Sequence, residues 1–205
     1  MSELENGLGQ PIGPPVEAWR ERPSPPRTAM IGRFARVEPI DVGRHAADLH
    51  VANMEDHDGR IWTYMGYGPF ATLEAYETWL RAACLGADPM FHAIVDQGTG
   101  RAAGLASYLR IEPKVGAIEV GHINLAPSLQ RTRAASEAMF LLMRRVFDEL
   151  GYRRCEWKSD ALNAPSRSAA IRLGFTYEGT FRQATIYKGR NRDTAWFAII
   201  DKDWP

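Results

Sequence analysis

The chain has 205 residues, in which 25 Lys and Arg side chains balance 25 Asp and Glu side chains, and 45% of the residues are hydrophobic. This length and composition provide enough apolar surface for a core without disulfides, which excludes a disordered or fibrous protein. No apolar run approaches the ~20 residues of a membrane span, so we expect no membrane association. Two cysteines, and a start without an apolar run behind basic residues, indicate a cytoplasmic protein without a signal peptide.

The net charge of zero is the sum of two parts of the chain with opposite net charge. Residues 1–128 carry 11 basic and 16 acidic side chains, whereas residues 129–196 carry 13 basic and 7 acidic side chains. The chain therefore lacks the uniformly basic character of many nucleic-acid binders, and we expect no nucleic-acid partner. The division favours a polyanionic ligand at the basic part and a cationic ligand at the acidic part. The alternative is that it only reflects how solvated faces are distributed.

The predicted elements begin after a proline-rich arm. Residues 1–26 contain six of the thirteen prolines and show no periodicity, so we interpret them as an irregular N-terminal arm in which Trp19 docks on the body. Residues 27–205 form the predicted domain. It opens with a strand over residues 29–37, a helix capped by Asp41 that ends near residue 53, and a helix capped by Thr72 that ends near residue 84.

The second part of the predicted domain is richer in strands. A hairpin signal joins strands over residues 91–96 and 101–109, and another strand covers residues 117–125. The later elements are a helix over residues 133–150, a strand over 154–159, a helix over 165–173, and strands over 176–182 and 194–201. This order predicts an α/β (α+β) fold with a mixed, mostly antiparallel sheet and a βαβ unit near its middle.

The junction between the strand at 117–125 and the long helix carries the clearest chemical signal. Free N–H groups at a helix N-terminus form an anion site. Here arginines add positive charge, hydroxyls add donors, and small residues allow close approach to the backbone; the residues are Gln130, Arg131, Thr132, Arg133, Ala134, Ala135 and Ser136. The alternative is an ordinary helix start flanked by arginines. Metalloprotease, EF-hand and Walker patterns are absent and the five histidines lack metal-ligand spacing, so we expect no metal.

The junction resembles the phosphate loop of the GNAT acetyltransferases, Gln/Arg-x-x-Gly-x-Gly/Ala, with Arg133 in the place of the usual Gly. Two further motifs resemble the Rim-type branch, which includes ribosomal-protein N-terminal acetyltransferases. They are the Glu119-Val-Gly strand and the Asn163-Ala-Pro-Ser166 segment, followed by Leu-Gly-Phe175. The resemblance covers about residues 30–203 and leaves the arm outside.

The resemblance implies a single GNAT-like domain whose twisted sheet, flanked by helices, splays between its fourth and fifth strands, at 117–125 and 154–159. Acetyl-CoA would enter this gap as a co-substrate. Its pantetheine would pair with backbone at Ile123, Asn124 and Leu125, its pyrophosphate would lie at residues 130–136, and Asn163 would bind the pantetheine amide. The alternative for Asn163 is a helix cap, and both roles can coexist.

The implied reaction is acetyl transfer from the thioester to a primary amine by direct attack in a ternary complex. An ammonium has no lone pair, so a base must first remove a proton. Glu119 is the candidate base, with His122 the second choice because strand alternation sends it to the opposite face unless a bulge intervenes. A backbone N–H near Asn124 or Leu125 would stabilise the oxyanion. Ser166 would donate to the departing thiolate, since Ala170 occupies the position of the family's usual Tyr. The alternative for Glu119 is a surface carboxylate of the strand, and the alternative for Ser166 is an ordinary serine in the first turn of a helix.

Aromatic side chains in the loop before the second helix form the predicted acceptor wall: Trp62, Tyr64, Tyr67 and Phe70. The alternative is that they belong to the core. The acceptor would be a small-molecule or peptide amine, and the branch is compatible with a homodimer. The alternative to an N-acetyltransferase is a non-catalytic acyl-CoA-binding or sensing module on the same fold.

Overall fold

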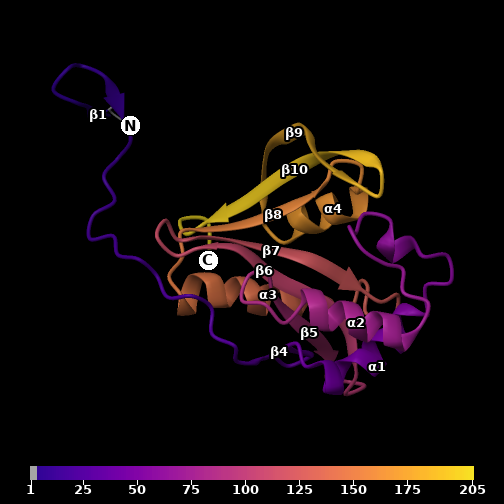
Figure 1. The fold of residues 1–205 in the computed structure, drawn as a ribbon. Coiled ribbons are helices and arrows are strands. Elements are labelled where there is room, and N and C mark those ends of the chain that lie inside the picture. The colour runs from indigo at the N-terminus through magenta and orange to yellow at the C-terminus, as the bar shows by residue number, and fades with distance from the viewer. Residues whose placement is uncertain (1–3) are drawn as a thin grey trace.

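A computed structural model describes residues 4–205. Its centre is an eight-stranded sheet in the order β3-β4-β5-β6-β7-β8-β10-β9 (Figure 1). The pairs are antiparallel except for β7 with β8, as predicted for a mixed sheet. The strands are β3 (Met30–Ile31), β4 (Ala35–Pro39), β5 (Met90–Asp96), β6 (Ala102–Glu112), β7 (Ala117–Leu125), β8 (Arg154–Asp160), β9 (Thr176–Tyr187) and β10 (Arg190–Ile200).

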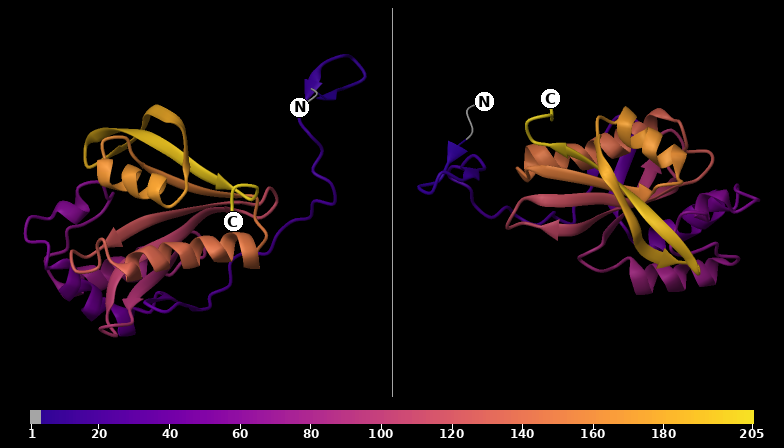
Figure 2. Two further views of the ribbon diagram at one scale, coloured as in Figure 1. Left: turned by 180° about the vertical axis from the view of Figure 1, so that it is seen from behind. Right: turned by 90° about the horizontal axis from the view of Figure 1, so that it is seen from above.

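Helices cover both faces of the sheet (Figures 1 and 2). They are α1 (Val42–Asn53) and α2 (Leu73–Ala83) on one face, and α3 (Arg133–Arg144) and α4 (Ala164–Arg172) on the other. A 3-10 turn at Arg60–Trp62 precedes α2, and a π-helical turn at Arg145–Glu149 extends α3. No helix within residues 4–205 is long and apolar enough to cross a membrane.

The predicted helix starts are confirmed by their caps. The Asp41 carboxylate accepts the backbone N–H of Arg44 at 3.0 Å, and the Thr72 hydroxyl accepts that of Ala75 at 3.2 Å. Each side chain satisfies an N–H group that has no partner within its helix. The local sequence therefore determines where α1 and α2 begin.

The strand predicted over residues 29–37 is two strands, β3 and β4, joined by a tight turn. The carboxylate of Glu137, on α3, accepts backbone N–H groups from Arg33 at 2.9 Å and Ala35 at 2.8 Å. These contacts hold the turn and join segments about a hundred residues apart. The sequence pattern does not reveal the break because the partner is distant in the chain.

Strands β9 and β10 extend beyond their predicted limits and form one long hairpin. Lys188 and Gly189, both with positive φ (48° and 70°), make the turn between them. Most side chains of β9 are exposed, so it lacks the alternation of apolar and polar residues that marks a half-buried strand. The sequence prediction accordingly missed residues 183–187 and 190–193.

The predicted splay between residues 117–125 and 154–159 is confirmed. Strands β7 and β8 pair from Ala117 opposite Arg154 to Glu119 opposite Glu156, and the pairing stops there. Beyond Glu119 the two strands diverge, and the edge of β7 that faces β8 has no strand partner among the described residues. The sheet thus opens into a V whose arms are β3–β7 and β8–β10.

The N-terminal arm runs away from the sheet (Figures 1 and 2). Residues 1–3 of the predicted arm lie outside the described residues. Against the prediction of wholly irregular structure, a small antiparallel ribbon forms from β1 (Leu4–Glu5) and β2 (Pro11–Ile12). The predicted docking of Trp19 is confirmed, because its Nε1–H donates to the carbonyl of Lys114 at 2.8 Å. The domain boundary at residue 27 stays a prediction.

Candidate active site

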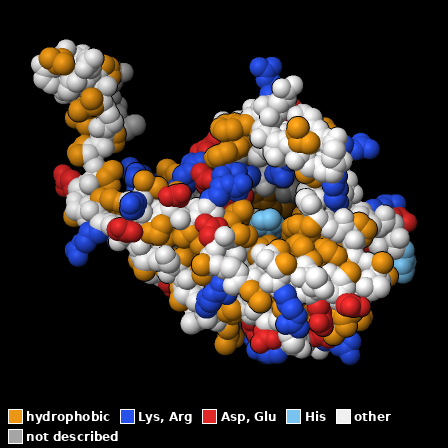
Figure 3. Space-filling model, in the orientation of Figure 1, with side chains coloured by type: hydrophobic (Ala, Val, Ile, Leu, Met, Phe, Trp, Pro, Cys, Tyr) orange, Lys and Arg blue, Asp and Glu red, His pale blue; other side chains and the backbone are white. Residues whose placement is uncertain are grey.

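A cavity of about 460 Å³ opens where β7 and β8 diverge, beneath the β9–β10 hairpin. Figure 3 shows this hollow, with Lys and Arg side chains around it and a histidine inside. Its lining includes five residues predicted for the site, drawn from the loop before α2, from β7 and from α4 with its N-cap: Tyr64, Glu119, Ile123, Asn163 and Ser166. Tertiary structure thus brings together residues that lie up to about a hundred positions apart.

Glu119, the predicted base, lies on β7 at the point of the splay and is only 4% exposed. Its Oε2 is 2.7 Å from Nη1 of Arg110 and 3.0 Å from Nζ of Lys158. Burial raises the pKa of Glu119 despite the opposing attraction of Lys158 and Arg110. The geometry provides a buried carboxylate that is oriented by two cations and is more basic than an ordinary glutamate.

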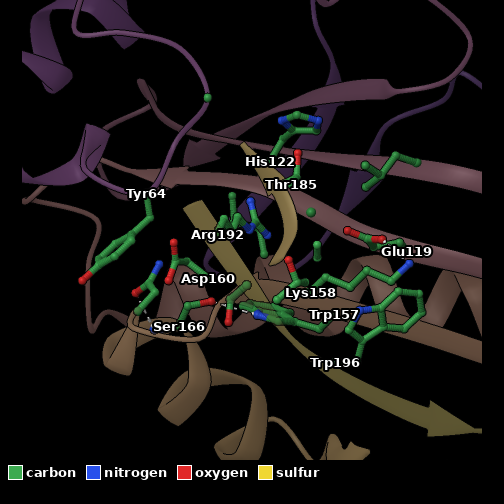
Figure 4. A pocket seen from close by; sticks show the side chains of 18 of the residues that line it. Tyr64, Glu119, His122, Trp157, Lys158, Asp160, Ser166, Thr185, Arg192 and Trp196 are labelled. Atoms are coloured by element: carbon green, nitrogen blue, oxygen red, sulfur yellow. Dashed lines mark hydrogen bonds and ion pairs between the residues drawn. The ribbon is translucent and has the colours of Figure 1, made fainter. Parts of the chain in front are cut away.

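His122, the second candidate base, lines the same cavity. Strand alternation would place it opposite Glu119, but the β6–β7 register shifts next to it, and His122 has a φ of 49°. This is the bulge on which the sequence prediction was conditional. Burial, helped by Arg110 and Arg192, lowers the pKa of His122 to about 4, so its imidazole is neutral at neutral pH. Figure 4 shows both candidates beside the cavity.

Ser166 lies in the first turn of α4, directly below the cavity. Its Oγ accepts the Nε1–H of Trp157, a β8 residue, at 2.9 Å. Since this bond uses the oxygen, the hydroxyl hydrogen of Ser166 remains available to donate. The side chain of Asn163 caps α4 by accepting the Ser166 N–H at 3.1 Å. Asn163 therefore has the capping role considered in the sequence analysis, and the residue also lines the cavity.

The predicted phosphate-binding residues, Gln130 through Ser136, lie at the start of α3 and do not line this cavity. The Thr132 hydroxyl caps α3, and Gln130 Nε2 donates to the Leu125 carbonyl at 2.9 Å. Arg131 is the residue with positive φ (60°), whereas Arg133 is the first helical residue, so its place does not require glycine. Arg131 and Arg133 are exposed, while the methyl groups of Ala134 and Ala135 are buried in the core.

The predicted acceptor wall is only partly where the sequence analysis placed it. Tyr64 lines the cavity, and its hydroxyl donates to the carbonyl of Leu162 at 3.1 Å. Trp62 is 4% exposed and packs edge-on against Tyr67 and Phe70, in the core between the sheet and α2. These three aromatics do not line the cavity, because their apolar rings complete the core beneath the loop.

Comparison with known proteins agrees with this geometry. A family model described as the acetyltransferase (GNAT) domain matches residues 36–176. The chain belongs to the GNAT acetyltransferase family. A GCN5-related N-acetyltransferase from Brucella melitensis is 44% identical over 93% of this chain and 86% of that one, with a TM-score of 0.90. A GNAT-family protein from Chromobacterium violaceum is 41% identical over 95% of this chain and 97% of that one, with a TM-score of 0.87.

A more distant solved structure shares the fold alone. An acetyltransferase from Salmonella typhimurium that modifies the N-terminal serine of the ribosomal protein L7/L12 is 21% identical, covers 84% of this chain and 98% of its own, and has a TM-score of 0.68. A search of curated proteins finds no match. The chain is therefore a GNAT N-acetyltransferase, and ribosomal-protein acetyltransferases are among its structural neighbours.

Several side chains that line the cavity of this GNAT acetyltransferase were not among the predicted site residues: Trp157, Lys158, Asp160, Arg192 and Trp196. Two of them could have been found from strand alternation, because Arg192, Thr194 and Trp196 are spaced by two along β10. The missing information was that β10 begins at residue 190 and not at residue 194. Within residues 4–205, no group of three or more His, Cys, Asp or Glu residues could hold a metal ion.

Proposed function

We propose that this GNAT acetyltransferase moves an acetyl group from acetyl-CoA to a primary amine by direct attack in a ternary complex. The observation that supports it most is the cavity at the β7–β8 splay, where Glu119, Asn163 and Ser166 come together from different elements. In this reaction the thioester supplies an activated acetyl carbonyl. The protein must supply an oriented donor site, a proton acceptor and a hydrogen-bond donor for the leaving sulfur.

The residues around the splay fit an elongated polyanionic thioester. The unpaired edge of β7 beyond Glu119 offers backbone groups to the amides of a pantetheine arm, and it includes Ile123, Asn124 and Leu125. The N-terminal end of α3, with exposed Arg131 and Arg133, suits the pyrophosphate through its N–H groups and positive charge.

Glu119 is the proposed proton acceptor. Its raised pKa makes it a better base than an exposed glutamate, and Arg110 and Lys158 fix its orientation. His122 remains the alternative, since it is neutral at neutral pH and faces the same cavity. Burial lowers the pKa of His122, which weakens it as a base, whereas burial raises the pKa of Glu119.

Ser166 is the proposed donor to the leaving thiolate. The bond from Trp157 Nε1 at 2.9 Å fixes the position of its Oγ and leaves the hydroxyl hydrogen to donate. Burial raises the pKa of Cys84 to about 12, and burial together with Glu156 and Glu119 raises that of Cys155. Neither thiol is a ready nucleophile, which supports direct transfer without an acetylated enzyme.

The proposal is tested by thiol release from acetyl-CoA in the presence of amines of different classes. We expect amine-dependent release of CoA with formation of the N-acetyl product, seen by mass spectrometry, and no acetylated enzyme. We also infer a cytoplasmic protein that acts without a metal, and addition of a chelator is expected to leave the rate unchanged. Tight CoA binding without turnover of any amine contradicts the proposal and favours a non-catalytic acyl-CoA-binding module.

A further inference from the structure

The charged side chains of the cavity do not all compensate one another. Five charged residues line it: Arg110, Glu119, Lys158, Asp160 and Arg192. Arg110 and Lys158 both pair with Glu119, and Lys158 also pairs with Glu156, outside the lining, at 2.8 Å. Asp160 and Arg192 form no ion pair with any residue between 4 and 205. The cavity therefore presents one unpaired cation and one unpaired anion.

Arg192 comes from β10 and shares the cavity-facing side of that strand with Thr194 and Trp196. Its Nε is buried and finds no hydrogen-bond partner in the described part of the chain. The guanidinium lies 5.9 Å from the ring centroid of Tyr187, at the outer limit of a cation–π contact. A buried N–H without an acceptor destabilises the free protein, and an anionic ligand would remove that cost.

Asp160 ends β8 and is 5% exposed. Its Oδ2 accepts the Tyr187 hydroxyl at 2.8 Å, and its Oδ1 accepts the Leu162 N–H at 2.8 Å. Both donors are neutral, so they orient the carboxylate without neutralising it. Figure 4 shows Asp160 and Arg192 on the same cavity, beside Tyr64. The two side chains thus provide complementary charges in the cavity that Tyr64, a residue of the predicted acceptor wall, also lines.

We propose that the acceptor is an amino acid or a close analogue, whose carboxylate binds Arg192 and whose ammonium binds at Asp160 before deprotonation. This inference rests on the proposed function and specifies its substrate class. A guanidinium binds a carboxylate through two parallel hydrogen bonds. A carboxylate suits the site better than a phosphate, because one unpaired cation balances one negative charge beside Asp160 and Glu119. Phe181 and Trp196, which also line the cavity, favour an apolar side chain on the acceptor.

The charge division predicted a cationic ligand at the acidic part of the chain, and the proposed acceptor combines such an ammonium with a carboxylate. The cavity lining contains three cations and two carboxylates, and its only charged residues from positions 1–128 are the paired Arg110 and Glu119. The net charge of a chain segment does not predict the charge of a cavity, since most charged side chains lie on the outer surface.

The test compares amino acids with their amides, which keep the amine and lose the negative charge. L-Leucine, L-leucinamide, L-phenylalanine and L-phenylalaninamide are titrated calorimetrically into the CoA-bound protein, and the same four are used in the thiol-release assay. We expect each acid to bind on the order of 10- to 100-fold more tightly than its amide, as for hydrogen bonds to a charged group. Arg192→Gln should bring this ratio close to one, and Arg192→Lys should give an intermediate ratio.

Arg190→Gln is the matched control, because Arg190 lies on the same strand two residues earlier and is exposed. It should keep the wild-type ratio. Equal binding of acids and amides by the wild type, or no binding of any of the four, overturns the inference. So does an Arg192→Gln variant whose KM rises for acetyl-CoA and not for the amino acid. If the acids bind with the expected pattern but no thiol is released, the specificity stands and the proposed function fails.

Discussion

Replacing Glu119 by glutamine removes the proposed proton acceptor while it preserves the shape of the side chain. The variant keeps a group that hydrogen-bonds to Arg110 and Lys158, which lie 2.7 and 3.0 Å from the native carboxylate. General-base catalysis contributes about 10²–10⁴-fold. We therefore expect kcat/KM for the amine to fall by about that factor in Glu119→Gln.

The structure also indicates that this variant stays folded. Burial raises the pKa of Glu119, so the ionised carboxylate is disfavoured by its surroundings, and glutamine mimics the protonated form. Lys158 keeps its second partner, Glu156, at 2.8 Å, and the Arg110 side chain is 58% exposed, so water screens its charge. We expect the free energy of unfolding to fall by no more than about 2 kcal/mol, within the ordinary range for point substitutions.

The assay is the pH profile of kcat/KM for the wild type, for Glu119→Gln and for a control, Glu156→Gln. The control removes the other carboxylate of Lys158 without changing the cavity lining. In the wild type, activity should fall with decreasing pH as Glu119 is protonated, at a pH above the usual glutamate pKa of about 4.3. Protonation of the amine substrate also affects the pH profile, but it does so equally for all three proteins.

Two results would refute this reasoning. If Glu119→Gln and Glu156→Gln lose activity equally, Glu119 acts only by holding Lys158. If Glu119→Gln keeps its activity and the acidic limb lies near pH 4, the base is His122, whose pKa is lowered to about 4. In that case His122→Asn should abolish the limb.

Three further substitutions have definite expected results. Ser166→Ala removes the proposed thiolate donor and the acceptor of Trp157 Nε1–H, so kcat should fall more than the acceptor KM changes, and chemical denaturation should show a loss of about 1–3 kcal/mol. Burial raises the pKa of Glu137, but three backbone N–H bonds together outweigh burial and bring the pKa below its ordinary value. The contribution of Glu137 to stability is therefore present above pH ~4.3 and is lost as the pH falls through the lowered pKa. Glu137→Gln should flatten this pH dependence of the denaturation midpoint. Gly116→Ala places a Cβ about 2.5 Å from the Trp19 ring at a φ of 66°, so it should release the arm and speed its proteolysis; unchanged Trp fluorescence and cleavage would contradict this.

Local sequence predicted most of the helix starts and the order of the elements. Asp41 and Thr72 cap their helices with contacts made within three residues, so no distant partner is needed. The strand at residues 29–37 was predicted as continuous because Glu137, which holds its break, is about a hundred residues away. The β9–β10 hairpin was underestimated because the mostly exposed β9 has no apolar alternation.

In the candidate site, too, some residues could be predicted from local sequence and others only from the tertiary structure. Glu119, Asn163 and Ser166 were identified from short motifs, whose spacing is a property of the chain. His122 faces the cavity only because a bulge reverses the alternation of β7. Trp62 is buried in the core, and Tyr67 and Phe70 pack against it and against Trp79 of α2, an arrangement that depends on packing between elements.

The sequence by itself predicted most of the elements, the family and three motif residues that line the cavity, because these depend on neighbours along the chain. Tertiary structure alone decided which charges compensate one another. The ion pairs around Glu119 join β6, β7 and β8, whereas Asp160 and Arg192, from β8 and β10, stay without an ionic partner in the described structure. A neutral net charge of 25 basic against 25 acidic side chains could not reveal this, since compensation depends on distances of about 3 Å between distant residues.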